Sequence, residues 1–211
     1  MLLETLSVGP LDVNCYIVGC GHHKTCAVID PGDGVERILR KVDGMGLTVK
    51  SIINTHAHAD HTGGNKEMKE ATGAPILISR DDAEMLTHPS MEDMAVFLGI
   101  APSPPPDVLF GDGDKLEICP CLTFEVLATP GHSPGGVCLY FGEGVITGDS
   151  LFRLSIGRTD LPGGNSQALI SSIRSKLFTL PDEVKVYPGH GEPSEIGYEK
   201  KYNPFLTGAF R

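Results

Sequence analysis

Three histidines and an aspartate lie within seven consecutive residues, and imidazole and carboxylate both bind divalent metal ions. The stretch is Thr55-His56-Ala57-His58-Ala59-Asp60-His61. His56 and His58 are separated by one small residue, so they can converge on one ion from an extended or turning segment. Asp60 and His61 lie further round the turn and suit a second ion better. Neutral imidazole and carboxylate ligands favour Zn²⁺, Fe²⁺ or Mn²⁺, and the lack of thiolates here argues against a closed structural zinc site.

A simpler interpretation makes this stretch a helix N-terminus, capped by Asp60 or Thr62, with solvated histidines. It is disfavoured because the chain has eight histidines in all, which would seldom fall three to a six-residue window. The stretch is therefore interpreted as a metal site.

The flanking sequence predicts that this cluster connects a strand to a helix. Residues 48–54 are rich in β-branched and apolar side chains, which is typical of a short buried strand. After Gly63-Gly64, residues 65–72 have a helix-like pattern. Open α/β sheets place their chemistry on such connections.

Three further metal-binding side chains, His132, Asp149 and His190, follow strand-like runs later in the chain. Those runs cover residues 123–128, 144–147 and 185–187. Because each side chain comes within a few residues of a strand end, all three can meet His56 at one sheet edge. The strand and helix order, in two similar halves, predicts two sheets packed face to face with helices outside.

A serine nucleophile is the main competing chemistry, because Gly131-His132-Ser133-Pro134-Gly135 matches the G-x-S-x-G elbow. That elbow requires a helix after the serine, whereas a second glycine and a strand follow here. The residue after the nucleophile must also lend a backbone N–H to the oxyanion hole, and Pro134 has none. A serine hydrolase is therefore rejected.

The composition predicts one globular domain over residues 1–211. Seventeen basic and twenty-seven acidic residues give a formal charge of −10 without a Lys/Arg cluster, which argues against a nucleic-acid partner. No apolar run approaches membrane-spanning length, and residues 1–6 have no basic start, so we expect a cytoplasmic protein without membrane contact. The oligomeric state stays open.

The six cysteines, at positions 15, 20, 26, 119, 121 and 138, form no C-x-x-C pair and lie in apolar strand-like stretches. Buried free thiols in a reducing compartment are favoured over disulfides or a metal site. His22 and His23, in a predicted exposed turn, are interpreted as bystanders. His88 has no partner ligand near it and is left out of the site.

Asp30 and residues 81–99 are two further features of the sequence. Asp30 ends the third predicted strand, and it is either a turn residue or a carboxylate that orients a ligand histidine. Residues 81–99 are predicted to be helical with an apolar stripe, and His88, which precedes Pro89, lies in a predicted loop.

The chain resembles the metallo-β-lactamase superfamily over nearly its whole length. The resemblance rests on H-x-H-x-D-H, a later isolated histidine, a strand-terminal aspartate and a last Gly-His. The resemblance implies an α/β fold, a four-layer αββα sandwich, with two divalent ions, zinc foremost and iron or manganese as alternatives. The implied ligands of the first ion are His56, His58 and His132. Those of the second are Asp60, His61 and His190, with Asp149 bridging the two ions.

Within the superfamily the chain looks most similar to the short glyoxalase II-like hydrolases of bacteria, because of Leu151-Phe152 and Gly157-Arg158-Thr159-Asp160. Arg158 falls where glyoxalase II enzymes carry a cation that contacts the glycine carboxylate of glutathione. Their aromatic partner two residues later is replaced by Asp160. We expect no helical C-terminal glutathione-binding domain, since the chain stops soon after His190. Thioester hydrolysis is thus better supported than glutathione specificity.

The implied substrate is a small anionic acyl thioester such as S-lactoylglutathione, attacked by hydroxide, with Asp60 and Asp149 as catalytic carboxylates and Arg158 binding substrate. The same Gly-Arg-Thr-Asp run also resembles persulfide dioxygenases, in which one iron would be held by His56, His132 and Asp149. A non-catalytic scaffold stabilised by metal is a second alternative. The completeness of both ligand sets argues against it, because a structural site closes with four ligands.

Overall fold

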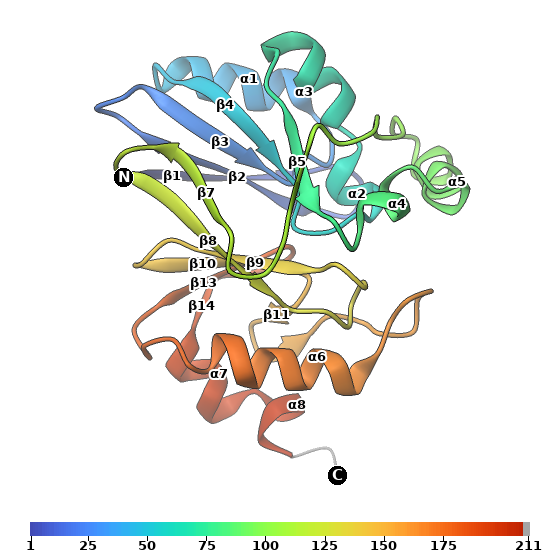
Figure 1. The fold of residues 1–211 in the computed structure, drawn as a ribbon, viewed down its shortest axis with the longest axis vertical. Helices are drawn as coiled ribbons and strands as arrows, with labels where there is room; N and C mark the ends of the chain where they lie inside the picture. Colours follow the sequence, from blue (N-terminus) through green and yellow to red (C-terminus); the bar gives the residue numbers. More distant parts are fainter. Residues whose placement is uncertain (209–211) are drawn as a thin grey trace.

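Two six-stranded sheets pack face to face, and helices cover both outer faces (Figure 1). The computed structural model describes residues 1–208. The predicted four-layer αββα sandwich is confirmed.

The N-terminal half of the chain builds the first sheet, in which the strands follow one another in sequence order. They are β1 (Leu2–Val8), β2 (Val13–Cys20), β3 (Thr25–Ile29), β4 (Thr48–Ile53), β5 (Ile76–Ser79) and β6 (Val108–Phe110). The first three form an antiparallel meander, and β3 to β6 run parallel. Helices α1 (Val35–Gly44) and α3 (Asn65–Thr72) cover the outer face. Val35, Ile38 and Val42 lie at helical spacing and bury one face of α1 against the sheet.

The C-terminal half builds the second sheet, in the order β14-β13-β10-β9-β8-β7. Its strands are β7 (Lys115–Cys119), β8 (Leu122–Ala128), β9 (Val137–Tyr140), β10 (Gly144–Gly148), β13 (Lys185–Pro188) and β14 (Ser194–Glu195). A short hairpin of β11 (Leu151–Phe152) and β12 (Ser155–Ile156) follows β10. The outer helices are α6 (Ser166–Ser172), which continues into a π-helical turn (Ile173–Leu177), α7 (Ile196–Tyr202) and α8 (Pro204–Thr207).

Three more helices lie beside the carboxyl ends of β4 and β5: α2 (Ala59–Thr62), α4 (Ala83–Leu86) and α5 (Pro89–Leu98). The prediction of helical structure over residues 81–99 is confirmed, and the predicted loop at His88 separates α4 from α5. A proline disfavours helical conformation in the residue before it, and His88 is extended, with φ −72° and ψ 141°. His88 accepts a hydrogen bond from the Ser90 backbone N–H at 3.2 Å, so it caps α5.

The core between the sheets is apolar, and its largest buried side chains include Tyr16, Phe110 and Phe124. Complete burial of one such side chain contributes about 1.5–3 kcal/mol. Separate apolar layers lie under the helices on each side. The sandwich is therefore a rigid support for the loops at its edges.

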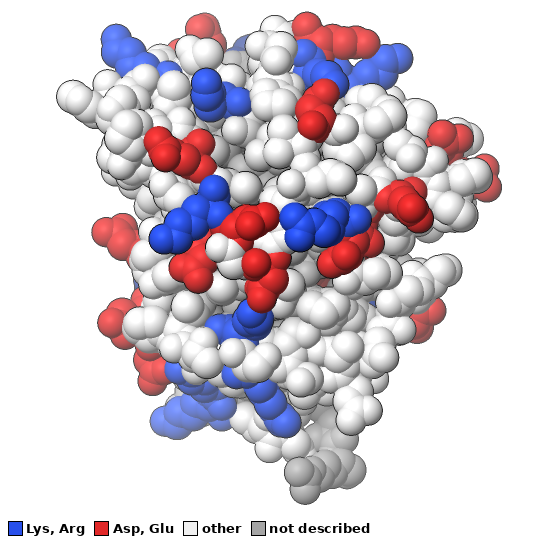
Figure 2. All heavy atoms as spheres, viewed as in Figure 1, with Lys and Arg blue, Asp and Glu red and all other residues white. Residues whose placement is uncertain are grey.

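Lys and Arg side chains are interspersed with Asp and Glu on the face shown in Figure 2. Lys176 pairs with Asp112, and Arg80 lies 3.8 Å from Asp114. Exposed pairs of this kind contribute about 0–1 kcal/mol each, so the apolar layers dominate stability. Within residues 1–208, no helix has both the length and the apolar content to cross a membrane.

Candidate metal centre

The seven predicted metal ligands converge beside the carboxyl ends of β4, β8, β10 and β13. The fold itself explains the convergence. β10 and β13 are parallel neighbours in one sheet, as β3 and β4 are in the other, so their carboxyl ends lie at the same edge. The donor atoms form three overlapping groups, each within 4.8 Å: His56, His58 and His132; His56, His61 and Asp149; and Asp60, His61 and His190.

The first group consists of buried imidazoles whose ring nitrogens face one another. Nδ1 of His58 lies 2.8 Å from Nε2 of His132. Nδ1 of His132 donates to the Arg158 carbonyl at 2.8 Å, which leaves Nε2 with its lone pair directed at His58. Nε2 of His56 is buried and has no hydrogen-bond partner among the described residues. These three nitrogens are arranged as donors to a cation.

The group of Asp60, His61 and His190 adds a carboxylate to two imidazoles. Oδ2 of Asp60 lies 3.4 Å from Nε2 of His190 and 3.6 Å from Nε2 of His61. Asp149 lies between this group and the group of His56, His58 and His132. Its Oδ1 is 3.4 Å from His61 Nε2, and its Oδ2 is 3.5 Å from His132 Nε2. One carboxylate therefore faces both groups.

This donor set fits divalent ions. Oδ1 of Asp149, like Nε2 of His56, is a buried polar atom without a hydrogen-bond partner among residues 1–208, and such an atom is costly to bury unless a ligand satisfies it. Nitrogen and oxygen donors suit Zn²⁺, Fe²⁺ and Mn²⁺.

Asp30 orients one of the imidazoles. Its side chain is fully buried and accepts hydrogen bonds from the Thr55 N–H at 2.8 Å, the Thr55 hydroxyl at 2.7 Å and Nδ1 of His61 at 3.1 Å. Its backbone has φ 51°, a left-handed conformation that aspartate tolerates. Of the two roles left open by the sequence, Asp30 therefore has the one that fixes a histidine, with Nε2 of His61 directed inward.

Asp82, which the sequence did not single out, joins the loops after β4 and β8. It is buried and accepts from the Ala57 N–H at 3.0 Å, the Ser133 hydroxyl at 2.7 Å and the Gly135 N–H at 2.5 Å. Burial raises the pKa of Asp82, although these hydrogen bonds oppose the shift. Ser133, the serine of the rejected elbow motif, thus donates to a structural carboxylate.

Electrostatics separate the two groups of imidazoles. Burial, together with neighbouring His132, lowers the pKa of His58 to about 4. Burial would also lower the pKa of His61, but the carboxylates of Asp149 and Asp60 outweigh it and raise this pKa well above the ordinary value. In return, His61 holds the pKa of Asp60 below its usual range against the effect of burial. The centre therefore keeps its carboxylates ionised.

Two glycines leave space for the centre. A Cβ at Gly189 would clash with Oδ1 of Asp149 and lie 2.8 Å from Cε1 of His61. A Cβ at Gly157 would clash with the Asp149 carbonyl. Any larger residue at either position would displace Asp149.

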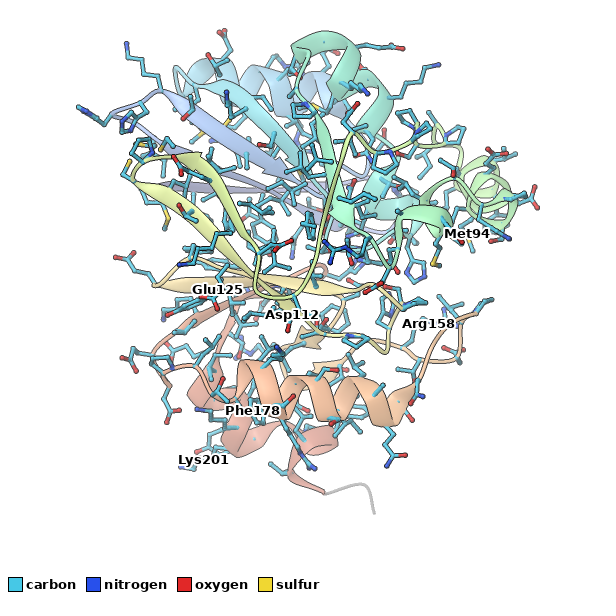
Figure 3. The ribbon with its side chains drawn as sticks, viewed as in Figure 1. Met94, Asp112, Glu125, Arg158, Phe178 and Lys201 are labelled. Atoms are coloured by element: carbon cyan, nitrogen blue, oxygen red, sulfur yellow. The ribbon has the colours of Figure 1, made fainter. Side chains whose placement is uncertain are left out.

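Arg158 contributes its backbone to the centre, while its side chain turns to solvent. The backbone carbonyl accepts from Nδ1 of His132, whereas the guanidinium forms a two-bond pair with Asp160 at 2.8 Å for both contacts. The side chains of this pair are 61% and 68% exposed. Figure 3 shows Arg158 in the loop before α6, on the same side of the molecule as Met94 in α5.

Comparison with known proteins identifies relatives along the whole chain. Residues 8–190 match the family model described as the metallo-beta-lactamase superfamily. The chain is 38% identical to the "Probable metallo-hydrolase YqgX" of Bacillus subtilis, covering 99% of each chain. It is 35% identical to the "Hydroxyacylglutathione hydrolase GloC" of Haemophilus influenzae, over 98% of this chain and 99% of that one. The crystal structure of TTHA1623 in a di-iron-bound form superposes with a TM-score of 0.86 at 38% identity, covering 96% of this chain and 100% of that chain.

Proposed function

The chain belongs to the metallo-β-lactamase superfamily, and we propose that it hydrolyses a small acyl thioester such as S-lactoylglutathione. The observation that carries the proposal is a pair of donor groups that both face Asp149, with buried donor atoms that have no hydrogen-bond partner among residues 1–208. The name of the Haemophilus influenzae relative supports the thioester as substrate. The metal is zinc in this proposal, with iron, found in the TTHA1623 structure, as the alternative.

His56, His58 and His132 would hold one ion, Asp60, His61 and His190 the other, and Asp149 both. Two bound ions would supply Lewis acidity, which polarises a carbonyl and lowers the pKa of water to about 7.

Side chains and one backbone carbonyl of the chain balance the charge of the ions and orient the ligand imidazoles. Asp60 stays a carboxylate because its neighbours keep its pKa low, so it balances the cations and is a poor proton acceptor. Asp30 and the Arg158 carbonyl accept hydrogen bonds from the outer nitrogens of His61 and His132, which directs the inner nitrogens toward the metal positions. The leaving thiol has a pKa of about 8.5, so it departs as a thiolate without a strong general acid.

The Arg158 side chain would bind a substrate carboxylate in the same proposal. Its present partner is Asp160 in an exposed pair, which is worth little and is easily exchanged for a ligand carboxylate. The matching two-bond geometry of guanidinium and carboxylate favours this exchange.

Two thioesters with the same acyl group, one on glutathione and one on an uncharged thiol, test this role. Arg158→Ala keeps the backbone carbonyl that orients His132, so it removes the side chain alone. We expect about a tenfold or greater loss of kcat/KM for the glutathione thioester and little change for the neutral one. Asp160→Ala is the matched variant: it frees the guanidinium and should not slow the charged substrate. Equal losses on both substrates in Arg158→Ala would assign the side chain to loop structure.

The competing function is persulfide oxidation at one iron held by His56, His132 and Asp149, which the Gly157-to-Asp160 run favours. Elemental analysis beside two assays separates the functions. Two ions at the candidate metal centre with S-lactoylglutathione hydrolysis support the proposal, whereas one iron at that centre with oxygen uptake on glutathione persulfide contradicts it. A metal-loaded protein that turns over neither substrate would be a metal-stabilised scaffold.

A further inference from the structure

Four metal-binding side chains outside the candidate metal centre lie together on two turns. Cys20 ends β2 and His23 lies in the β2–β3 turn, while Cys119 ends β7 and Cys121 lies in the β7–β8 turn. Their donor atoms all lie within 4.8 Å of one another. The two turns belong to different sheets and are found together at the left of Figure 1.

The contacts inside this cluster join both turns. Sγ of Cys20 lies 2.7 Å from Sγ of Cys121, which in turn lies 3.5 Å from Sγ of Cys119. Nδ1 of His23 is 3.3 Å from each of the Cys20 and Cys121 sulfurs. The His23 backbone N–H also points at Sγ of Cys20, at 3.5 Å, and a hydrogen bond of this kind favours a thiolate. One imidazole nitrogen and three sulfurs therefore face a common point.

The expectation that these cysteines are simple buried thiols, and that His23 is a bystander, does not describe this arrangement. Cys20 and Cys119 are buried, each with 6% of its surface exposed, but Cys121 and His23 are exposed. The cluster is thus supported from inside and open to solvent on one side. An ion can enter without unfolding the sandwich.

We propose that Cys20, His23, Cys119 and Cys121 form a second metal site, of the closed Cys₃His type, that binds Zn²⁺. Three thiolates and one imidazole complete the tetrahedral shell of a structural zinc ion and leave no position for a substrate. The donors differ in kind from those of the candidate metal centre, which are imidazoles and carboxylates.

The site is also separate from that centre in space. The strand β3 begins two residues after His23 and ends next to Asp30, which contacts His61. Five strand residues at about 3.3 Å each place the two sites about 17 Å apart along the strand.

An ion bound at this site would cross-link the two sheets. Cys20 and Cys119 belong to the apolar layer between the sheets, and their turns are linked in sequence only through about a hundred intervening residues. A bond that closes so long a loop restricts the unfolded chain strongly, and metal binding adds directly to folding stability. The site therefore acts on stability and not on turnover.

Cobalt substitution tests the proposal, because thiolate ligands give Co²⁺ an intense near-ultraviolet charge-transfer band that imidazole and carboxylate ligands do not. The full-length protein, reduced and freed of metal, is titrated with Co²⁺ under anaerobic conditions. We expect one equivalent to develop the sulfur-to-cobalt band. Cys121→Ser should lose most of it and bind one ion fewer per chain. Zn²⁺ should raise the melting temperature of the wild type more than that of the variant.

The turn offers a matched pair of histidine variants. His23→Ala should weaken metal binding at the thiolate site about tenfold or more. Removing a group that only supports a ligand already costs about 10- to 100-fold in metal affinity, and His23 is itself a ligand in this proposal. His22→Ala changes the neighbouring exposed histidine, which is outside the cluster, and should leave the band unchanged. Thioester hydrolysis by either variant reports on the other centre alone and should be unaffected.

Absence of the band in wild-type protein would overturn the proposal, as would equal effects of the two histidine variants. A reduced protein with free thiols at Cys20 and Cys121 that binds no ion beyond those of the candidate metal centre would overturn it too. None of these outcomes depends on thioester hydrolysis, so the failure of one proposal is distinguishable from that of the other.

Discussion

Replacing Asp30 by asparagine should impair one metal ligand while leaving the fold in place. Oδ1 of Asp30 accepts from the Thr55 N–H, and Oδ2 accepts from the Thr55 hydroxyl and from Nδ1 of His61. In Asp30→Asn the remaining carbonyl can keep the Thr55 N–H, so the new NH₂ group faces His61. The amide would donate to Nδ1 and drive the imidazole proton to Nε2, the atom that faces Asp60 and Asp149.

The expected magnitude follows from these contacts. Loss of the partner that orients a ligand histidine costs about 10- to 100-fold in metal affinity, or about 1.4–2.7 kcal/mol. Asp30→Ala would instead leave three buried donors unpaired at about 1–3 kcal/mol each, a total of about 3–9 kcal/mol. That total is comparable with the whole stability of a domain, so the alanine variant is unsuitable for the assay.

Competition with a chromophoric chelator measures the affinity of each ion, and urea unfolding of the metal-free protein measures stability. Glu199→Gln is the matched control, because Glu199 is a fully buried carboxylate that accepts from the Leu154 N–H, Ser194 and Asn203 and contacts none of the clustered imidazoles. We expect both variants to lose stability and only Asp30→Asn to bind its second ion more weakly. Unchanged affinity in Asp30→Asn, or an equal loss in Glu199→Gln, would refute the reasoning.

Three further predictions concern the same centre. Asp60→Ala should lose one ion of the centre and Asp149→Ala both, as the difference from wild type in elemental analysis. An ion content and affinity equal to those of the wild type in Asp60→Ala would exclude that residue as a ligand. Because neighbouring carboxylates outweigh burial and raise the pKa of His61 and His190, both imidazoles must release protons on binding metal. The affinity of the centre for metal should thus rise with pH, by up to about 100-fold per pH unit. A metal affinity that stays constant from about pH 6 to 8 would contradict this. Gly189→Ala should weaken metal binding, since the new Cβ displaces Asp149, and wild-type affinity in a chelator titration would argue against that clash.

The clustering of the candidate metal ligands was predictable because these residues carry a dense local signal. Three histidines in seven residues mark one loop. The later candidate ligands each follow a strand, and functional residues of α/β sheets lie at the carboxyl ends of strands. The fold class followed from the same alternation of strands and helices together with the family resemblance.

Asp82 could not be predicted, because its partners Ala57 and Ser133 lie 25 and 51 residues away and no local pattern links them. The cysteine cluster was missed for the same reason. Cys20 and Cys121 are 101 residues apart, and the sheet packing that unites them is a long-range property of the fold. The break at His88 was predictable from the sequence, because a residue before proline disfavours helical conformation.

The most direct test of the central claim is the rate of S-lactoylglutathione hydrolysis by metal-free protein as Zn²⁺ or Fe²⁺ is returned to it. We expect negligible kcat/KM without metal, recovery on loading, and no recovery in His132→Ala, which lacks a ligand facing His58 and Asp149. Full activity in the metal-free protein, or in loaded His132→Ala, would contradict the assignment of the reaction to this centre.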